Sequence, residues 1–306
     1  MRRTPRVAAV ALVCLALATG CGPAASSAPA TIAVPGCPVA VLPSSAVGAA
    51  PSPAASPAST STCTATESTP GTAPATPGTL TVLAAASLSG AFTTIAHAFE
   101  ADHPGVAVRL SFDGSAALVT QIQQGAPADL VATADQPTMN LLVDAGLVTG
   151  KPTVVATNAL VIAVPADNPA HVGELADLAR VRTVVCAPAV PCGAAAQRVS
   201  AAAGVTLTPV SLEPSVAAVA AKVARGEADA GLVYRTDVLA AGRALSAVAL
   251  PDTPAIAAAA RTSYPIAVVA GTPRPALAAA FIAAVDGPDG RAILQAAGFG
   301  APGAAS

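Results

Sequence analysis

Aromatic residues and charges are scarce in this chain of 306 residues. Aromatic residues make up 2% of it, with no tryptophan, and charged residues make up 10%. A hydrophobic core must therefore be built from alanine, valine and leucine, which favours helices packed closely on a sheet. Lysine and arginine are scattered singly and form no basic stripe, so nothing in the sequence indicates binding to nucleic acid.

The signatures of several enzyme classes are also missing. There is no P-loop and no G-x-G-x-x-G motif. The sequence G-S-A-A at residues 114–117 lacks the second glycine of the G-x-S-x-G elbow of serine hydrolases. No CxxC pair occurs, and His97, His103 and His171 lie far from every cysteine in sequence, which argues against a metal site. We therefore expect no catalysis and no cofactor.

The first twenty residues resemble a lipoprotein export signal. Basic residues up to Arg6 precede an apolar run over residues 7–17, too short for a membrane-spanning helix of about 20 residues. The run leads into L-A-T-G-C at residues 17–21, which resembles a lipobox. Cys21 is then expected to carry the lipid as the first mature residue. Cleavage would remove three of the 15 basic residues and none of the 17 acidic ones, so the mature chain would be more negative than the whole.

Four cysteines remain once Cys14 has left with the signal and Cys21 carries lipid. In an oxidising compartment, four cysteines are expected to form two disulfides. Pairing by proximity in sequence predicts the bridges Cys37–Cys63 and Cys186–Cys192. Four free buried thiols are the alternative, which requires that the export signal be misread.

The segment 22–78 consists mainly of proline, alanine, serine and threonine, and its only charged residue is Glu67. Such a segment buries too little apolar surface to order itself. We expect residues 21–78 to be a flexible tether between the membrane and a folded domain.

From residue 80 onwards, apolar runs typical of strands alternate with patterns typical of helices. In the first half we expect strands at 80–85, 106–112 and 129–133, and helices at 88–101, 116–124 and 137–146. In the second half we expect strands at 160–164, 182–186, 208–212, 229–234 and 264–270, and helices at 193–203, 216–225 and 275–285. This rhythm predicts an α/β fold with two lobes, each a mainly parallel sheet flanked by helices. A ligand cleft is expected between the lobes, beyond the carboxyl ends of the strands.

Four places share one local pattern, in which a strand ends, a small or hydroxyl residue follows and a helix begins. They are residues 86–88, 114–116, 191–194 and 214–216. A helix N-terminus has unpaired amide donors and about half a positive charge, so several of them can bind an anion without a basic side chain. Tyr234, at a strand end, would add a phenolic donor. A single serine before a helix is more often only an N-cap, so the prediction depends on the joint spacing.

Several motifs resemble the periplasmic molybdate-binding protein family, in collinear order from about residue 80 to 300. They are A-A-A-S-L at 84–88, F-D-G-S at 112–115, Q-G-A-P-A-D-L at 124–130, A-D at 134–135, N-A-L-V at 158–161, G-L-V-Y at 231–234 and Y-P-I-A-V at 264–268. The resemblance implies a two-lobed periplasmic-binding-protein fold. Residues 79–157 and 262–306 would form lobe 1 and residues 158–261 lobe 2, with hinges near 156–160 and 259–265.

The resemblance also implies which residues hold the oxyanion. Ser87 and Ser115 would bind it from lobe 1 by hydroxyl and amide, and Cys192 and Val216 by their amides and Tyr234 by its phenol from lobe 2. Cys192 departs from the alanine that is familiar in the family, and a bridge to Cys186 would stiffen its loop.

Two acidic residues in the resembling region, Asp129 and Asp135, lie six residues apart. No nucleophile or metal set accompanies them, so we expect structural roles. Asp129 is expected to precede a strand, and Asp135 to cap the helix that begins at Pro137.

As a function, the resemblance implies capture of molybdate, and also of tungstate, by a monomer that closes on the ion and docks on an ABC permease. A receptor for sulfate, phosphate or another oxyanion is the alternative within the same class. An exported lipoprotein of this fold that transports nothing is the alternative from another class.

Overall fold

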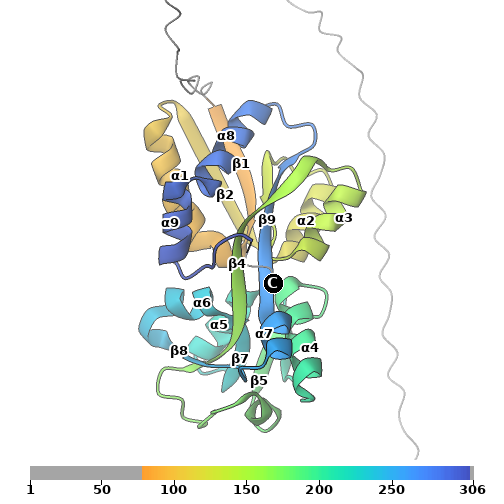
Figure 1. Cartoon of the computed structure of the whole chain (residues 1–306), viewed down its shortest axis with the longest axis vertical. Coiled ribbons are helices and arrows are strands. Elements are labelled where there is room, and N and C mark those ends of the chain that lie inside the picture. Colours follow the sequence, from red (N-terminus) through yellow and green to blue (C-terminus); the bar gives the residue numbers. More distant parts are fainter. Residues whose placement is uncertain (1–77, 304–306) are drawn as a thin grey trace, which may run out of the picture. The chain divides into compact units, whose positions relative to one another are not determined.

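Residues 78–303 are the part of the chain that the computed structural model describes. Figure 1 shows them as two groups of helices and strands connected by two long strands. The predicted lipid site at Cys21, the export signal, the tether up to residue 77 and the Cys37–Cys63 bridge lie outside these residues. Of the helices within 78–303, none has both the length and the apolar character needed to cross a membrane.

The first sheet begins with three parallel strands, each followed by a helix. The strands are β1 (Gly78–Ala85), β2 (Val106–Asp113) and β3 (Leu130–Ala132), in the order β2-β1-β3. The short turn η1 (Ala86–Leu88) leads from β1 into α1 (Ser89–Asp102), and α2 (Ser115–Gln123) and α3 (Gln136–Asp144) follow β2 and β3. This part confirms the predicted alternation of strands and helices.

Two long strands connect this sheet with the second one. β9 (Arg261–Val269) lies antiparallel between β3 and β4 (Val148–Pro165). β4 pairs with β9 as far as Ala159, which faces Arg261, and from Leu160 onwards it pairs with β7. β4 therefore belongs to both sheets, and it changes partner within the region predicted as a hinge.

The second sheet has the order β4-β7-β5-β6, with β8 on the other side of β4. Its strands are β5 (Thr183–Cys186), β6 (Ser211–Glu213), β7 (Ala230–Tyr234) and β8 (Leu245–Val248). Its helices are α4 (Pro191–Ala203), α5 (Val216–Ala224), α6 (Arg235–Ala241) and α7 (Pro254–Ala260), with the short turns η2 (Leu175–Ala179) and η3 (Gly242–Ala244). β5 pairs in parallel with β6 and β7, whereas β7 and β8 are antiparallel to β4.

The last two helices, α8 (Pro275–Asp286) and α9 (Pro288–Ala296), return to the first sheet and pack against α1. Phe281 of α8 meets Phe92 and Phe99 of α1 edge-on, with ring centroids 6.3 and 5.2 Å apart. Three of the five phenylalanines in the chain therefore lie where the C-terminal helices cover this sheet.

Some elements differ from the sequence-based predictions. The strand predicted at 160–164 is the last part of β4, which begins at Val148. The first part of β4 was not predicted because Gly150 and Pro152 interrupt the strand pattern in the sequence. Pro152 falls at an irregularity of the β4–β9 ladder between Thr149 and Thr153. Helices α6, α7 and α9 and strand β8 were not predicted, since they are short or rich in alanine. The placement of residues 79–157 and 262–306 in one lobe and 158–261 in the other stays a prediction.

Candidate anion-binding site

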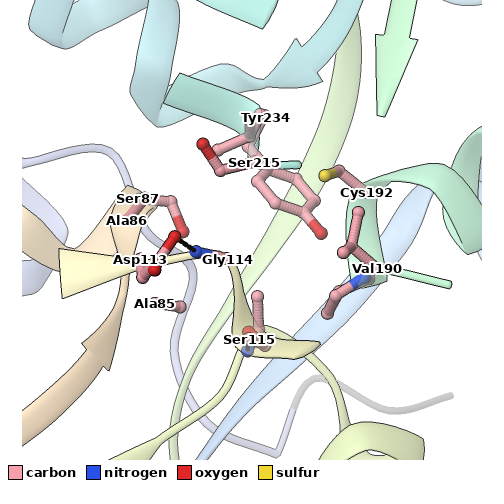
Figure 2. A pocket seen from close by; sticks show the side chains of 13 residues that line it. Ala85, Ala86, Ser87, Asp113, Gly114, Ser115, Val190, Cys192, Ser215 and Tyr234 are labelled. Atoms are coloured by element: carbon pink, nitrogen blue, oxygen red, sulfur yellow. Dashed lines mark hydrogen bonds between the residues drawn. The ribbon is translucent and has the colours of Figure 1, made fainter. Parts of the chain in front are cut away.

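A small pocket lies where strand ends and helix starts of the two sheets meet (Figure 2). It encloses about 240 Å³ of empty space, including its open mouth, and is smaller than two other pockets of about 830 and 1560 Å³. The structure brings together in its wall all of the residues predicted to hold an oxyanion: Ser87, Ser115, Cys192, Val216 and Tyr234. Residues far apart in sequence therefore converge on one small pocket.

Three α-helices begin at the pocket. α2 begins at Ser115 and α4 at Pro191, and neither helix has a side chain that caps its first amides. α5 begins at Val216, and the hydroxyl of Ser215 accepts a hydrogen bond of 3.3 Å from the amide of Ala218, so Ser215 has the ordinary N-cap role. The first amides of a helix have no partner inside it, so these helix starts present free donors and partial positive charge to the pocket.

The hydroxyls of the two predicted serines are both held from behind. Ser115 is 2% exposed, and its Oγ accepts a hydrogen bond of 3.0 Å from the amide of Ala134. Ser87 Oγ lies 2.9 Å from the phenolic oxygen of Tyr264. A serine hydroxyl that accepts one hydrogen bond keeps its own proton for a further acceptor, so Ser115 can donate into the pocket.

Tyr234 is 1% exposed, and within the described residues its phenolic oxygen is the buried side-chain polar atom that has no hydrogen-bond partner. In Figure 2 this hydroxyl points into the space beside Ser115 and Val190. The hydroxyl of Thr262 lies nearby and donates to the carbonyl oxygen of Ala134. Burial raises the pKa of the Tyr234 phenol well above its ordinary value, so the phenol keeps its proton and can donate it to a ligand. An orphaned buried donor of this kind costs about 1–3 kcal/mol unless a ligand satisfies it.

The predicted disulfide Cys186–Cys192 is confirmed, with 5.7 Å between the Cα atoms. It joins the end of β5 to the first turn of α4, so it holds the short loop that carries Val190 to the pocket. The next residue has to be glycine, because a Cβ on Gly193 would lie 1.9 Å from the carbonyl oxygen of Ala187. Bridge and glycine together bring the start of α4 close to the strand end.

The wall of the pocket contains no lysine, arginine or histidine, and its one charged residue is Asp113. The carboxylate of Asp113 accepts hydrogen bonds from the amide of Gly114 at 2.7 Å and from the side-chain amide of Gln121 at 3.4 Å. Sequence reasoning missed this residue, although it stands inside the F-D-G-S motif, because the search was for donors. An anion bound here is therefore held by uncharged donors beside a carboxylate.

Asp129 and Asp135 have the structural roles expected of them. Asp129 is 3% exposed, precedes β3 and accepts a hydrogen bond of 2.7 Å from the amide of Thr81. Asp135 is the N-cap of α3 and accepts one of 2.9 Å from the amide of Thr138. Among residues 78–303, no cluster of three or more histidine, cysteine, aspartate or glutamate side chains is arranged to hold a metal ion.

Two sheets that share a long strand, with a small pocket of helix starts and hydroxyls between them, define the class of two-lobed solute-binding proteins. Residues 80–300 match the family model of the bacterial extracellular solute-binding proteins, and the chain belongs to this family.

Its relatives include the molybdate-binding protein ModA of Mycobacterium tuberculosis, which is 45% identical over 225 residues that make up 73% of this chain and 85% of the relative. Two solved structures share the fold. The periplasmic molybdate-binding protein of Azotobacter vinelandii has a TM-score of 0.62 at 22% identity, over 73% of this chain and 99% of its own. The sulfate-binding protein SubI of Mycobacterium tuberculosis has a TM-score of 0.64 at 22% identity, over 74% and 88%. The resemblance to molybdate-binding proteins predicted from the motifs is confirmed.

Proposed function

We propose that this protein captures molybdate outside the cytoplasm and delivers it to an ABC importer, and that tungstate binds at the same site. The observation that carries the proposal is the buried, unpartnered hydroxyl of Tyr234, which points into a small pocket walled by helix starts and serines. The identity of 45% to a molybdate-binding protein supports this choice of ion.

The pocket suits a dianion because its donors are amide and hydroxyl groups, which can bind the ion without a positively charged side chain. The hydroxyls of Ser87, Ser115 and Tyr234 and the amides of Cys192 and Val216 would surround the oxygens of one tetrahedral ion. Hydrogen bonds to a charged group contribute about 1.5–3 kcal/mol each, so five such bonds can offset the loss of the ion's hydration. Selection among tetrahedral dianions would come from pocket size, since their charge and shape are shared.

The groups at the pocket support a binding role rather than catalysis. No histidine, lysine or free thiol lines it, because Cys192 is in the disulfide. A hydroxyl nucleophile needs an adjacent base, and the only ionisable group besides Tyr234 is Asp113, which is engaged with Gly114 and Gln121.

Outside the described residues, the proposal includes a lipid on Cys21 and a tether that keeps a monomeric receptor at the outer face of the membrane; the tether predicted over residues 21–78 is one residue shorter, because Gly78 begins β1. The lipobox-like sequence at 17–21 supports the anchor. The partner would be the permease subunit of the importer, which recognises the closed form.

A protonated oxyanion such as hydrogenphosphate is the second candidate ligand, and Asp113 is the observation that favours it. Hydrogenphosphate carries an O–H group that can donate a hydrogen bond to the carboxylate of Asp113, whereas molybdate and sulfate at neutral pH carry none.

Calorimetric titration of the purified protein with molybdate, tungstate, sulfate and phosphate at neutral pH tests the proposal. We expect molybdate and tungstate to bind at least 100-fold more tightly than the other two, a difference of about 2.7 kcal/mol. The Asp113→Asn variant serves as the matched control, because loss of the charge should tighten molybdate binding and weaken any phosphate binding. If phosphate binds most tightly and this binding is lost in Asp113→Asn, the second candidate ligand is established. If no oxyanion binds, both candidate ligands are refuted.

A further inference from the structure

A chain of buried hydrogen bonds runs from the pocket into the strands that connect the two sheets. It begins at Ser87, whose Oγ lies 2.9 Å from the phenolic oxygen of Tyr264 on β9. Tyr264 is fully buried and does not line the pocket. Asn158 on β4, 6% exposed, stands behind it, with its side-chain nitrogen 3.3 Å from the same phenolic oxygen.

Asn158 fixes the direction of its own bonds in this chain, and the direction of the bond between Ser87 and Tyr264 is inferred from them. Its side-chain oxygen accepts a hydrogen bond of 2.9 Å from the amide of Ala159, which can only donate, and this identifies the other end of the side chain as the NH₂ group. That NH₂ group donates to Thr236 Oγ1 at 2.8 Å and to the phenolic oxygen of Tyr264 at 3.3 Å. Both of its protons are used, and neither bond can be reversed.

The phenol of Tyr264 therefore accepts from Asn158 and has one proton of its own to donate. Burial raises the pKa of this phenol, so the proton stays on it. Ser87 Oγ is the acceptor within hydrogen-bond distance. Because Ser87 then accepts from behind, its own proton is free to point into the pocket, where an anion needs a donor.

We propose that Tyr264 and Asn158 are positioning residues that keep the Ser87 hydroxyl oriented as a donor towards the bound oxyanion. This inference rests on the proposed function. It gives two residues that do not touch the ligand a role in how tightly the protein binds the ligand. Ser115 is oriented in the same sense by another group, the amide of Ala134. Each serine thus has its own support, and the two supports can be tested separately.

The chain of bonds also joins the two sheets. Ser87 follows β1 of the first sheet, Asn158 and Tyr264 lie on β4 and β9 near the point where β4 changes partner, and Thr236 lies in α6 beside Tyr234. The orientation of Ser87 therefore depends on the arrangement of the shared strands. A free serine hydroxyl at the end of β1 would instead sample all of its rotamers.

Double-mutant cycles on molybdate affinity test the proposal. We expect Ser87→Ala to weaken binding about tenfold and Tyr264→Phe about fivefold. In the Ser87→Ala background, Tyr264→Phe should have an effect of less than about twofold, because the hydroxyl that it orients is already gone. The control cycle pairs Tyr264→Phe with Ser115→Ala, and here the two losses should multiply.

The thermal midpoint of each ligand-free variant is measured alongside, so that a general loss of structure is recognised by equal effects in both cycles. Should Tyr264→Phe fail to fold, Asn158→Ala interrupts the chain one step further back and is paired with the same two serine variants. Losses that multiply in the Ser87 cycle as they do in the Ser115 cycle would overturn the proposal while leaving the proposed function intact. A wild-type protein that binds no oxyanion would overturn the proposed function, and this inference with it.

Discussion

Gly114, at the start of α2, and Pro214, just before α5, are in such close contact that a Cβ on Gly114 would lie 2.2 Å from the carbonyl oxygen of Pro214. Gly114 belongs to the first sheet's side of the pocket and Pro214 to the second sheet's side. The two sides therefore meet at a point where no side chain fits. Glycine is needed here for space, since its φ of −62° is open to any residue.

Gly114→Ala should prevent this contact without harming either sheet. We expect molybdate affinity to fall at least tenfold, because the donors of α4 and α5 can no longer approach those of α2. The midpoint of thermal unfolding of the ligand-free protein should change little. Calorimetry and small-angle scattering with and without molybdate provide the measurement. Compaction equal to that of the wild type upon binding would contradict this reading of Gly114.

Tyr234→Phe should have opposite effects on the free and the bound protein. Without ligand, the change removes a buried hydroxyl that lacks a partner, so the free energy of unfolding should stay the same or rise by up to about 1 kcal/mol. Affinity for molybdate should fall about 10- to 100-fold, because a donor to the ion is lost. Thermal unfolding with and without saturating molybdate measures both effects. A destabilised free protein would show that the hydroxyl has a protein partner instead.

Loss of the Cys186–Cys192 bridge should lower both the stability of the protein and its affinity for molybdate. The bridge spans a sequence separation of 6, and the chain-entropy relation gives a stability loss of about 2 kcal/mol. Because Cys192 lies in the wall of the pocket, we also expect several-fold weaker molybdate binding in the double variant Cys186→Ser/Cys192→Ser. Reductant should reproduce the effect in the wild type and leave the double variant unchanged. Equal affinities with and without the bridge would exclude a role for it in the site.

The carboxyl group of Asp237 should make stability depend on pH. Burial raises its pKa from 3.8 to about 7, although its carboxylate accepts a hydrogen bond from the amide of Tyr234. Between these two values the folded protein holds a proton that the unfolded chain has released, so the free energy of unfolding should fall as pH rises from about 4 to 7. The fall should be on the order of 2 kcal/mol, with allowance for partial exposure of the side chain.

Chemical denaturation at several pH values, in the wild type and in Asp237→Asn, checks this expectation. The variant should lack the decline. Carboxyl groups with a lowered pKa, such as that of Asp229 hydrogen-bonded to Arg182, act in the opposite direction but only below about pH 4. An equal slope in both proteins between pH 5 and 7 would assign the dependence to another group.

The residues predicted to hold the anion could be found in the sequence because each stands where a strand ends or a helix begins. Ser115 and Val216 each open a helix, and Tyr234 ends a strand, so patterns of a few residues locate them. The convergence of these places follows from the general geometry of parallel strands, whose carboxyl ends share one edge of a sheet.

The groups behind the pocket could not be predicted in this way. Tyr264 stands in an apolar run and reads as a core residue, and its partner Ser87 is 177 positions away. Asn158 is buried and hydrogen-bonded to Thr236 and Tyr264, and only the folded arrangement of the shared strands brings these partners to it. The first part of β4 escaped prediction because Pro152 and its neighbours interrupt the strand pattern.

The position of β9 has a consequence for the order in which the chain acquires its structure. The place between β3 and β4 is filled by residues that come about a hundred positions later, so the first sheet stays incomplete until Val269 has emerged. During synthesis, the first sheet therefore lacks one strand while the intervening β5–β7 unit can already form from neighbouring segments. The sheet whose first strands are made earliest is thus the last to be completed.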